Sequence, residues 1–109
     1  MMRFLMTFDE YQFKCELTRL KSASDMYCFL NLAAEVGEVL SLEAKLLRDG
    51  ANMETYRENL KKELGDVLWH IAMIAKDHGF PLSDIAQTNI DKLTSRKARN
   101  TISGNGDNR

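Results

Sequence analysis

The sequence predicts an all-α fold, arranged like a four-helix bundle. Apolar residues recur at helical spacing in four stretches, and short segments rich in Gly, Ser, Asp and Pro separate these stretches. No run alternates apolar and polar residues as a half-buried strand does. The 109 residues suffice for one domain with a modest core, and we expect oligomerisation to complete that core.

The first helix is expected over residues 8–20. Thr7 and Glu10 have the spacing of a capping box, which marks the start of a helix. Phe8, Tyr11 and Cys15 then follow one another at helical steps and define the apolar side.

The second helix is expected over residues 25–48, and Gly50 gives the glycine signal that ends many helices. Glu35 and Glu38 lie one turn apart on one side of it, with Asn31 a turn earlier. Apolar residues flank these acids on both sides, so both sides of the helix need to be covered. A bundle core or a subunit interface would provide that cover.

The third helix is expected over residues 54–78, ending at Gly79. It carries a second acidic pair, Glu63 and Asp66, beside its apolar stripe. His70 follows one turn later on the same side and is most simply a structural residue or one that orients a metal ligand.

The fourth helix is expected over residues 84–98, with Ser83 as its cap. Asn89, Lys92 and Arg96 recur at steps of three and four residues and therefore share one face. Residues 1–99 thus form the predicted domain, and residues 100–109, rich in Gly and Asn, form a tail expected to be flexible.

The two acidic pairs are the principal candidate site. Glu35 with Glu38, and Glu63 with Asp66, each present two carboxylates from one side of a helix. Like charges this close repel, and a divalent cation would remove the repulsion. Hard oxygen ligands suit magnesium, for which manganese can substitute.

Composition excludes several function classes. The formal net charge of −1 gives no indication of nucleic-acid or membrane-surface binding, and no apolar run is long enough to span a bilayer. Cys15 and Cys28 lack metal-ligand spacing, and the first residues lack the apolar core of a secretory signal. We expect reduced cysteines in packing roles and a cytoplasmic location.

Four segments resemble the MazG-like nucleotide pyrophosphohydrolases, an all-α family. Residues 31–38, Asn-Leu-Ala-Ala-Glu-Val-Gly-Glu, are similar to that family's first acidic segment. Residues 62–69, Lys-Glu-Leu-Gly-Asp-Val-Leu-Trp, are similar to its second. Asn89, Lys92 and Arg96 match its basic ending, and Tyr11-Gln12 matches its Tyr-Gln near the N-terminus.

The resemblance implies a homo-oligomer, at least a dimer and by expectation a dimer of dimers. It implies hydrolysis of a (deoxy)nucleoside triphosphate between the α and β phosphates, giving the monophosphate and pyrophosphate. The residues that match the family's catalytic metal ligands are the four acids, Glu35, Glu38, Glu63 and Asp66. The matching phosphate contacts are Lys92 and Arg96. Asn89 and Gln12 are expected to contact the sugar or base, and Asn31 to contact the substrate or orient a metal ligand.

Other functions remain open on the sequence alone. A di-iron carboxylate bundle would want Glu-x-x-His on two helices, a motif this chain does not contain. A non-catalytic helical interaction or regulatory module would use the apolar faces for a partner. The substrate could also be another phosphoanhydride, such as a phosphoribosyl or diphosphate-linked nucleotide. Trp69 could stack on a base, although helix packing explains it more simply.

Overall fold

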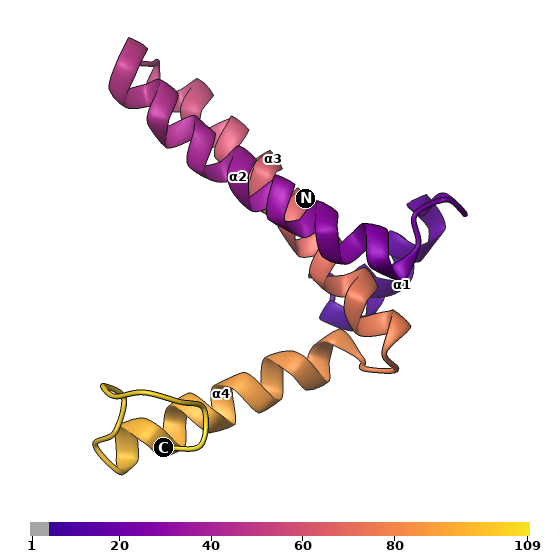
Figure 1. The fold of residues 1–109 in the computed structure, drawn as a ribbon, viewed down its shortest axis with the longest axis vertical. Coiled ribbons are helices and arrows are strands. Elements are labelled where there is room, and N and C mark those ends of the chain that lie inside the picture. The colour runs from indigo at the N-terminus through magenta and orange to yellow at the C-terminus, as the bar shows by residue number, and fades with distance from the viewer. Residues whose placement is uncertain (1–4) are drawn as a thin grey trace.

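The structure is a computed structural model that describes residues 5–109. Within this range the chain forms four α-helices and no strand, so the predicted all-α fold class is confirmed (Figure 1). The helices are α1 (Phe8–Thr18), α2 (Asp25–Asp49), α3 (Met53–Asp77) and α4 (Leu82–Ala98). None of them is long and apolar enough to cross a membrane.

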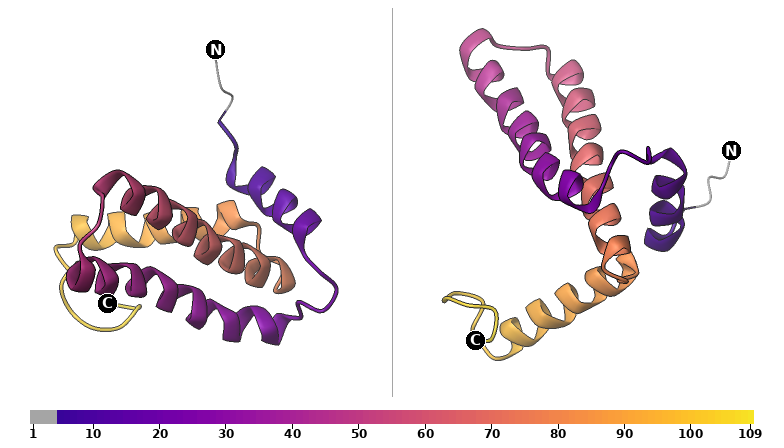
Figure 2. Two further views of the ribbon diagram at one scale, coloured as in Figure 1. Left: turned by 90° about the horizontal axis from the view of Figure 1, so that it is seen from above. Right: turned by 45° about the vertical axis from the view of Figure 1, so that its right-hand side comes forward.

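Helices α2 and α3 form a long antiparallel hairpin (Figure 2). Gly50 ends α2 with a φ of +69°, a left-handed conformation that favours glycine. Asn52 then caps α3, because its side-chain oxygen accepts from the backbone N–H groups of Glu54 and Thr55. This short connection fixes which residues of the two helices lie opposite one another.

Helix α1 packs against α3 beside the start of α2 and closes the core there. Thr7 caps α1 by accepting from the N–H of Glu10 at 3.1 Å, as its spacing predicts. Buried apolar residues from all four helices pack together in one core cluster: Cys15, Cys28, Ala72, Met73 and Leu82. Both cysteines are free and buried, in agreement with a packing role.

The start of α4 differs from the prediction. The helix begins at Leu82 after Pro81, so Ser83 lies inside it and the prediction that Ser83 caps it is wrong. Asp9 of α1 takes over the capping, because its carboxylate accepts from the backbone N–H of Ser83 at 3.0 Å and from its hydroxyl at 2.7 Å. These bonds lower the pKa of Asp9. A helix end can thus be capped by a side chain distant in sequence.

Helix α4 diverges from the hairpin, so that the α2–α3 hairpin and α4 form the two arms of a wedge-shaped molecule (Figures 1 and 2). Its backbone lies close to α1 and to the neighbouring end of α3, but no Cα atom of α4 lies within 8 Å of one in α2. Large apolar side chains therefore remain exposed on both arms, among them Leu40 of α2 at 64 % and Ile90 of α4 at 57 %. One chain does not cover these faces. That oligomerisation covers these faces and completes the core stays a prediction.

Residues 101–109 turn back along the last turns of α4 (Figure 1). The segment contains no helix, and side chains from α4 bond to its backbone. The flexibility expected of this tail stays a prediction, but its contacts bear on the site described next.

Candidate metal and phosphate site

Packing of α2 against α3 brings the two acidic segments together. Glu35, Glu63 and Asp66 each offer a carboxylate oxygen, and these oxygens lie within 4.8 Å of one another. Glu35 and Glu63 are half-buried, whereas Asp66 is exposed. Three hard oxygen donors converging from two helices form a set that suits a magnesium-sized divalent cation.

Glu38 stands outside this triad but belongs to the same electrostatic neighbourhood. Loss of hydration raises the pKa of Glu63, and the negative charges of Asp66, Glu38 and Glu35 raise it further. Lys45 opposes the shift. The ionised form of Glu63 is therefore disfavoured, and bound positive charge nearby would favour it.

A buried histidine and an asparagine are hydrogen-bonded to the residues of the cluster. The amide nitrogen of Asn31 lies 2.9 Å from His70 Nε2 and 3.4 Å from Glu35 Oε1. His70 Nδ1 lies 2.7 Å from the backbone oxygen of Asp66. Because an amide donates, Nε2 accepts and Nδ1 carries the proton in this arrangement. His70 is only 6 % exposed, and both of its ring nitrogens have partners, as expected of a structural residue or one that orients a ligand.

A hollow of about 340 Å³ adjoins the triad, because Glu35 lines both; Asn31 and His70 also line the hollow. Trp69 forms another wall, and its indole N–H donates to the hydroxyl of Thr18 at 2.8 Å. This bond ties α3 to α1, which agrees with a packing role for the tryptophan. The hollow leaves room beside the acids for part of a ligand.

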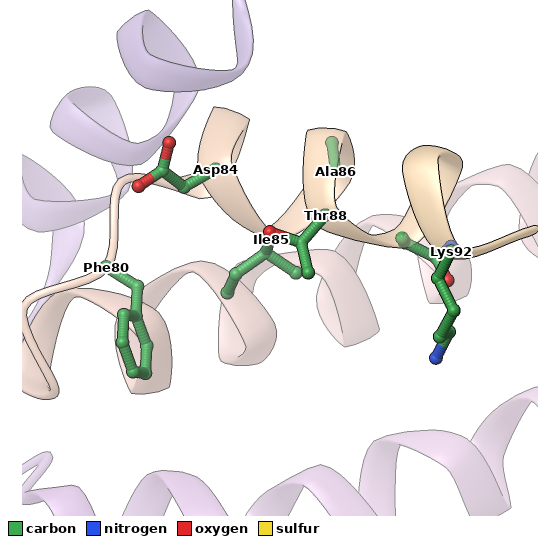
Figure 3. Close-up of a pocket in the computed structure, with 7 residues that line it drawn as sticks. Phe80, Asp84, Ile85, Ala86, Thr88 and Lys92 are labelled. Carbon is green, nitrogen blue, oxygen red and sulfur yellow. The ribbon is translucent and has the colours of Figure 1, made fainter. Parts of the chain in front are cut away.

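The cations of α4 occupy the other arm of the wedge. A groove of about 590 Å³ along α4 is lined by Lys92 and Asn89, and Figure 3 shows Phe80, Ile85 and Lys92 pointing to one side of the helix. No Cα atom of α4 lies within 8 Å of one in α2, the helix that carries Glu35. One chain therefore brings the acids together but leaves the helix with the cations apart from α2.

Arg96 and Lys92 are both paired with the segment that follows α4. Arg96 is 4 % exposed, and its Nη2 donates to the backbone oxygen of Asp107 at 2.7 Å. The Asp107 carboxylate lies 3.1 Å from Lys92 Nζ and 3.3 Å from Arg96 Nη2. The pKa of Asp107 is lowered by these bonds. Sequence reasoning missed Asp107 because the tail carries no periodic pattern that would place it.

Gln12 lies at the joint between α1, α3 and α4, away from the acids. Its amide nitrogen donates to the backbone oxygens of Ala72 at 3.1 Å and Phe80 at 3.0 Å. Its side-chain oxygen accepts from the N–H of Leu82 at 3.1 Å. These three bonds occupy the amide, and the substrate contact expected of Gln12 stays a prediction.

The fold and site together define an all-α protein with a carboxylate cluster on one helical hairpin and a basic face on a separate helix. A family model described as the MazG nucleotide pyrophosphohydrolase domain matches residues 25–100. The Gene 37 protein of Mycobacterium phage L5 is 42 % identical over 85 residues, which are 76 % of this chain and 75 % of the phage protein. No solved structure matches the chain significantly. The chain belongs to the MazG nucleotide pyrophosphohydrolase domain family.

Proposed function

We propose that the protein is a magnesium-dependent nucleoside triphosphate pyrophosphohydrolase, which cleaves a (deoxy)nucleoside triphosphate between the α and β phosphates. The observation that carries the proposal is the convergence of Glu35, Glu63 and Asp66 within 4.8 Å, in a chain of this family. The products are the nucleoside monophosphate and pyrophosphate.

The donor set fits the expected metal. All candidate ligands are carboxylates. Burial raises the pKa of Glu63, and the negative charges of the neighbouring acids raise it further. Glu35, Glu63 and Asp66 would hold magnesium or manganese, with Glu38 beside them. The bound cation would supply charge neutralisation for phosphate oxygens and would lower the pKa of a water.

The protein's own groups have separable tasks in this proposal. Glu38, exposed and outside the triad, accepts the proton of the attacking water. Asn31 holds Glu35 in place through the bond described above. Lys92 and Arg96 bind the phosphates, the arginine through its planar guanidinium and the lysine as a point charge. Asn89, in the groove beside Lys92, contacts the sugar or base.

The proposed active site is shared between copies of the chain. Because the backbone of α4 stays apart from that of α2 in one chain, the α4 cations would approach the acids of a second copy. The exposed apolar faces of both arms support such an assembly, at least a dimer and by expectation a dimer of dimers. The two free, buried cysteines fit a reducing cytoplasmic compartment.

Product identification tests the proposed chemistry. The protein is incubated with ribo- and deoxyribonucleoside triphosphates, with magnesium or with chelator, and the products are separated. We expect monophosphate and pyrophosphate, lost with chelator and in Glu38→Gln. The control Glu58→Gln changes an exposed glutamate of α3 outside the cluster and should retain activity. Diphosphate and phosphate as products, or no turnover of any triphosphate, would refute the proposal.

A complementation experiment tests the shared site. Glu63→Gln and Lys92→Ala are each expected to inactivate the enzyme. If each site takes its acids from one subunit and its cations from another, every mixed dimer contains one site with neither substitution. Equal mixing after subunit exchange should then restore about a quarter of the wild-type activity. No recovery, with exchange confirmed by mass spectrometry, would show that acids and cations act from the same chain.

A further inference from the structure

The segment after α4 covers a cation that the proposed function needs. Arg96 is 4 % exposed, although most of its neighbours on α4 are exposed. The cover consists of the backbone oxygens of Gly106 at 3.3 Å and Asp107 at 2.7 Å, together with the Asp107 carboxylate. A phosphate group cannot reach Arg96 while this cover is in place.

The covering segment is held by hydrogen bonds and ion pairs, which water or an anion can replace. The guanidinium of Arg109 donates to the backbone oxygens of Thr101 and Ile102 at 3.0 and 2.7 Å. Arg99 donates to the backbone oxygen of Arg109 at 2.9 Å. Ile102, the segment's large apolar residue, is 45 % exposed. A loop held by charges and hydrogen bonds, without an apolar core, opens at little cost.

Two features indicate that an anion other than Asp107 can take its place. The Nε of Arg96 is buried and has no hydrogen-bond partner in the described structure, so one donor of the guanidinium is left unused. The Asp107 side chain is 81 % exposed although it bonds to both cations. A phosphate has more acceptor oxygens than a carboxylate, so it could accept from Nε and Nη2 of Arg96 and from Nζ of Lys92 together.

We propose that residues 101–109 form an autoinhibitory strap, in which the Asp107 carboxylate occupies the Lys92–Arg96 pair and is displaced by the phosphates of the substrate. The proposal rests on the proposed function, because it regulates the same phosphate-binding cations. In the closed form, strap and triphosphate compete for one site. The apparent affinity for the triphosphate is therefore lower than the intrinsic affinity by the fraction of open molecules.

Asp107→Asn removes the competing charge while keeping the side-chain shape. The probe is inorganic tripolyphosphate, titrated calorimetrically into the full chain in the presence of chelator, so that metal chemistry is absent. We expect roughly 2- to 10-fold tighter binding, the range that follows from losing two partly exposed ion pairs. The matched control Asp91→Asn removes a charge next to Lys92 in sequence, on the same helix, and should leave the affinity unchanged.

Gly106→Ala opens the strap by a different route. Gly106 has a φ of +83°, and an added Cβ would meet no atom within 4 Å, so the substitution strains only the closed backbone. We expect tighter tripolyphosphate binding here too, with faster hydrogen exchange of residues 102–107 before ligand is added. Unchanged affinity in both variants would overturn the strap.

The outcomes separate the strap from the proposed enzyme. Tighter tripolyphosphate binding by Asp107→Asn and Gly106→Ala supports the strap even if no triphosphate is hydrolysed, which would refute the proposed function alone. Hydrolysis by the wild type, with neither affinity nor KM altered in the two variants, supports the function and refutes the strap.

Discussion

The joint at Gln12 yields the sharpest test of whether a residue that matches a family motif touches substrate or supports the fold. In the structure its amide connects three backbone groups of two other elements, Ala72 of α3 and Phe80 and Leu82 around the start of α4. Gln12→Ala removes both donors and the acceptor at once. Leu82 is 3 % exposed, so its N–H would lose its partner where water has little access.

The expected loss of stability follows from those three bonds. A hydrogen bond between neutral groups contributes about 0.5–1.5 kcal/mol net, and an unpaired buried donor costs about 1–3 kcal/mol. We therefore expect Gln12→Ala to lower the free energy of unfolding by about 2–4 kcal/mol. For a chain of this size that corresponds to a fall in Tm of roughly 10–20 °C.

Thermal and urea unfolding of the full chain, followed by circular dichroism, measure this loss. Gln12→Glu should be at least as damaging: its carboxylate can still accept from Leu82, but it cannot donate to the two carbonyl oxygens and places a negative charge against them. Gln87→Ala is the matched control, since Gln87 is an exposed helical glutamine whose amide donates to Asp91 one turn along the same helix. A Gln12→Ala protein of wild-type stability with a raised KM would refute this reasoning and make Gln12 a substrate contact.

Three further predictions concern charge. The pKa of Glu63 is raised, so its ionisation lowers the stability of the fold. We expect the Tm of the metal-free protein to fall as the pH rises through that raised pKa. Magnesium should restore the Tm, which a titration followed by thermal unfolding would show. Glu63→Gln should abolish the rise in Tm caused by magnesium. Arg19 bonds both oxygens of Asp77 at 2.8 and 2.7 Å and lowers its pKa, so Asp77→Asn should cost about 1–3 kcal/mol at neutral pH in urea unfolding. That difference should disappear as the pH falls through the lowered pKa, and a constant difference down to acid pH would contradict the pairing.

Local signals in the sequence predicted the helices well because their ends are determined locally. Thr7 caps α1 and Gly50 ends α2 through groups only a few residues away. The start of α4 could not be placed in this way, since Asp9 and Gln12 of α1 determine it through tertiary contacts. Ser83 has the right chemistry for a cap, but here it donates to Asp9.

The candidate site was predictable in part for the same reason. Helical spacing alone put Glu63 and Asp66 on one side of their helix. Their meeting with Glu35 also depends on the register of the α2–α3 hairpin, which the turn around Gly50 and the cap at Asn52 determine. The cover over Arg96 had no such signal, because the tail contains neither periodicity nor an apolar anchor.

The position of α4 links assembly to phosphate binding. Its exposed apolar residues, such as Ile90, and its cations lie on one helix that the chain leaves apart from α2. If α4 closed onto its own hairpin, it would bury apolar area but would leave a second copy little surface to bind. On the proposed function, the open wedge therefore makes the metal cluster dependent on a partner for its phosphate-binding cations. The Asp107 strap then keeps those cations neutralised until a more highly charged anion displaces it.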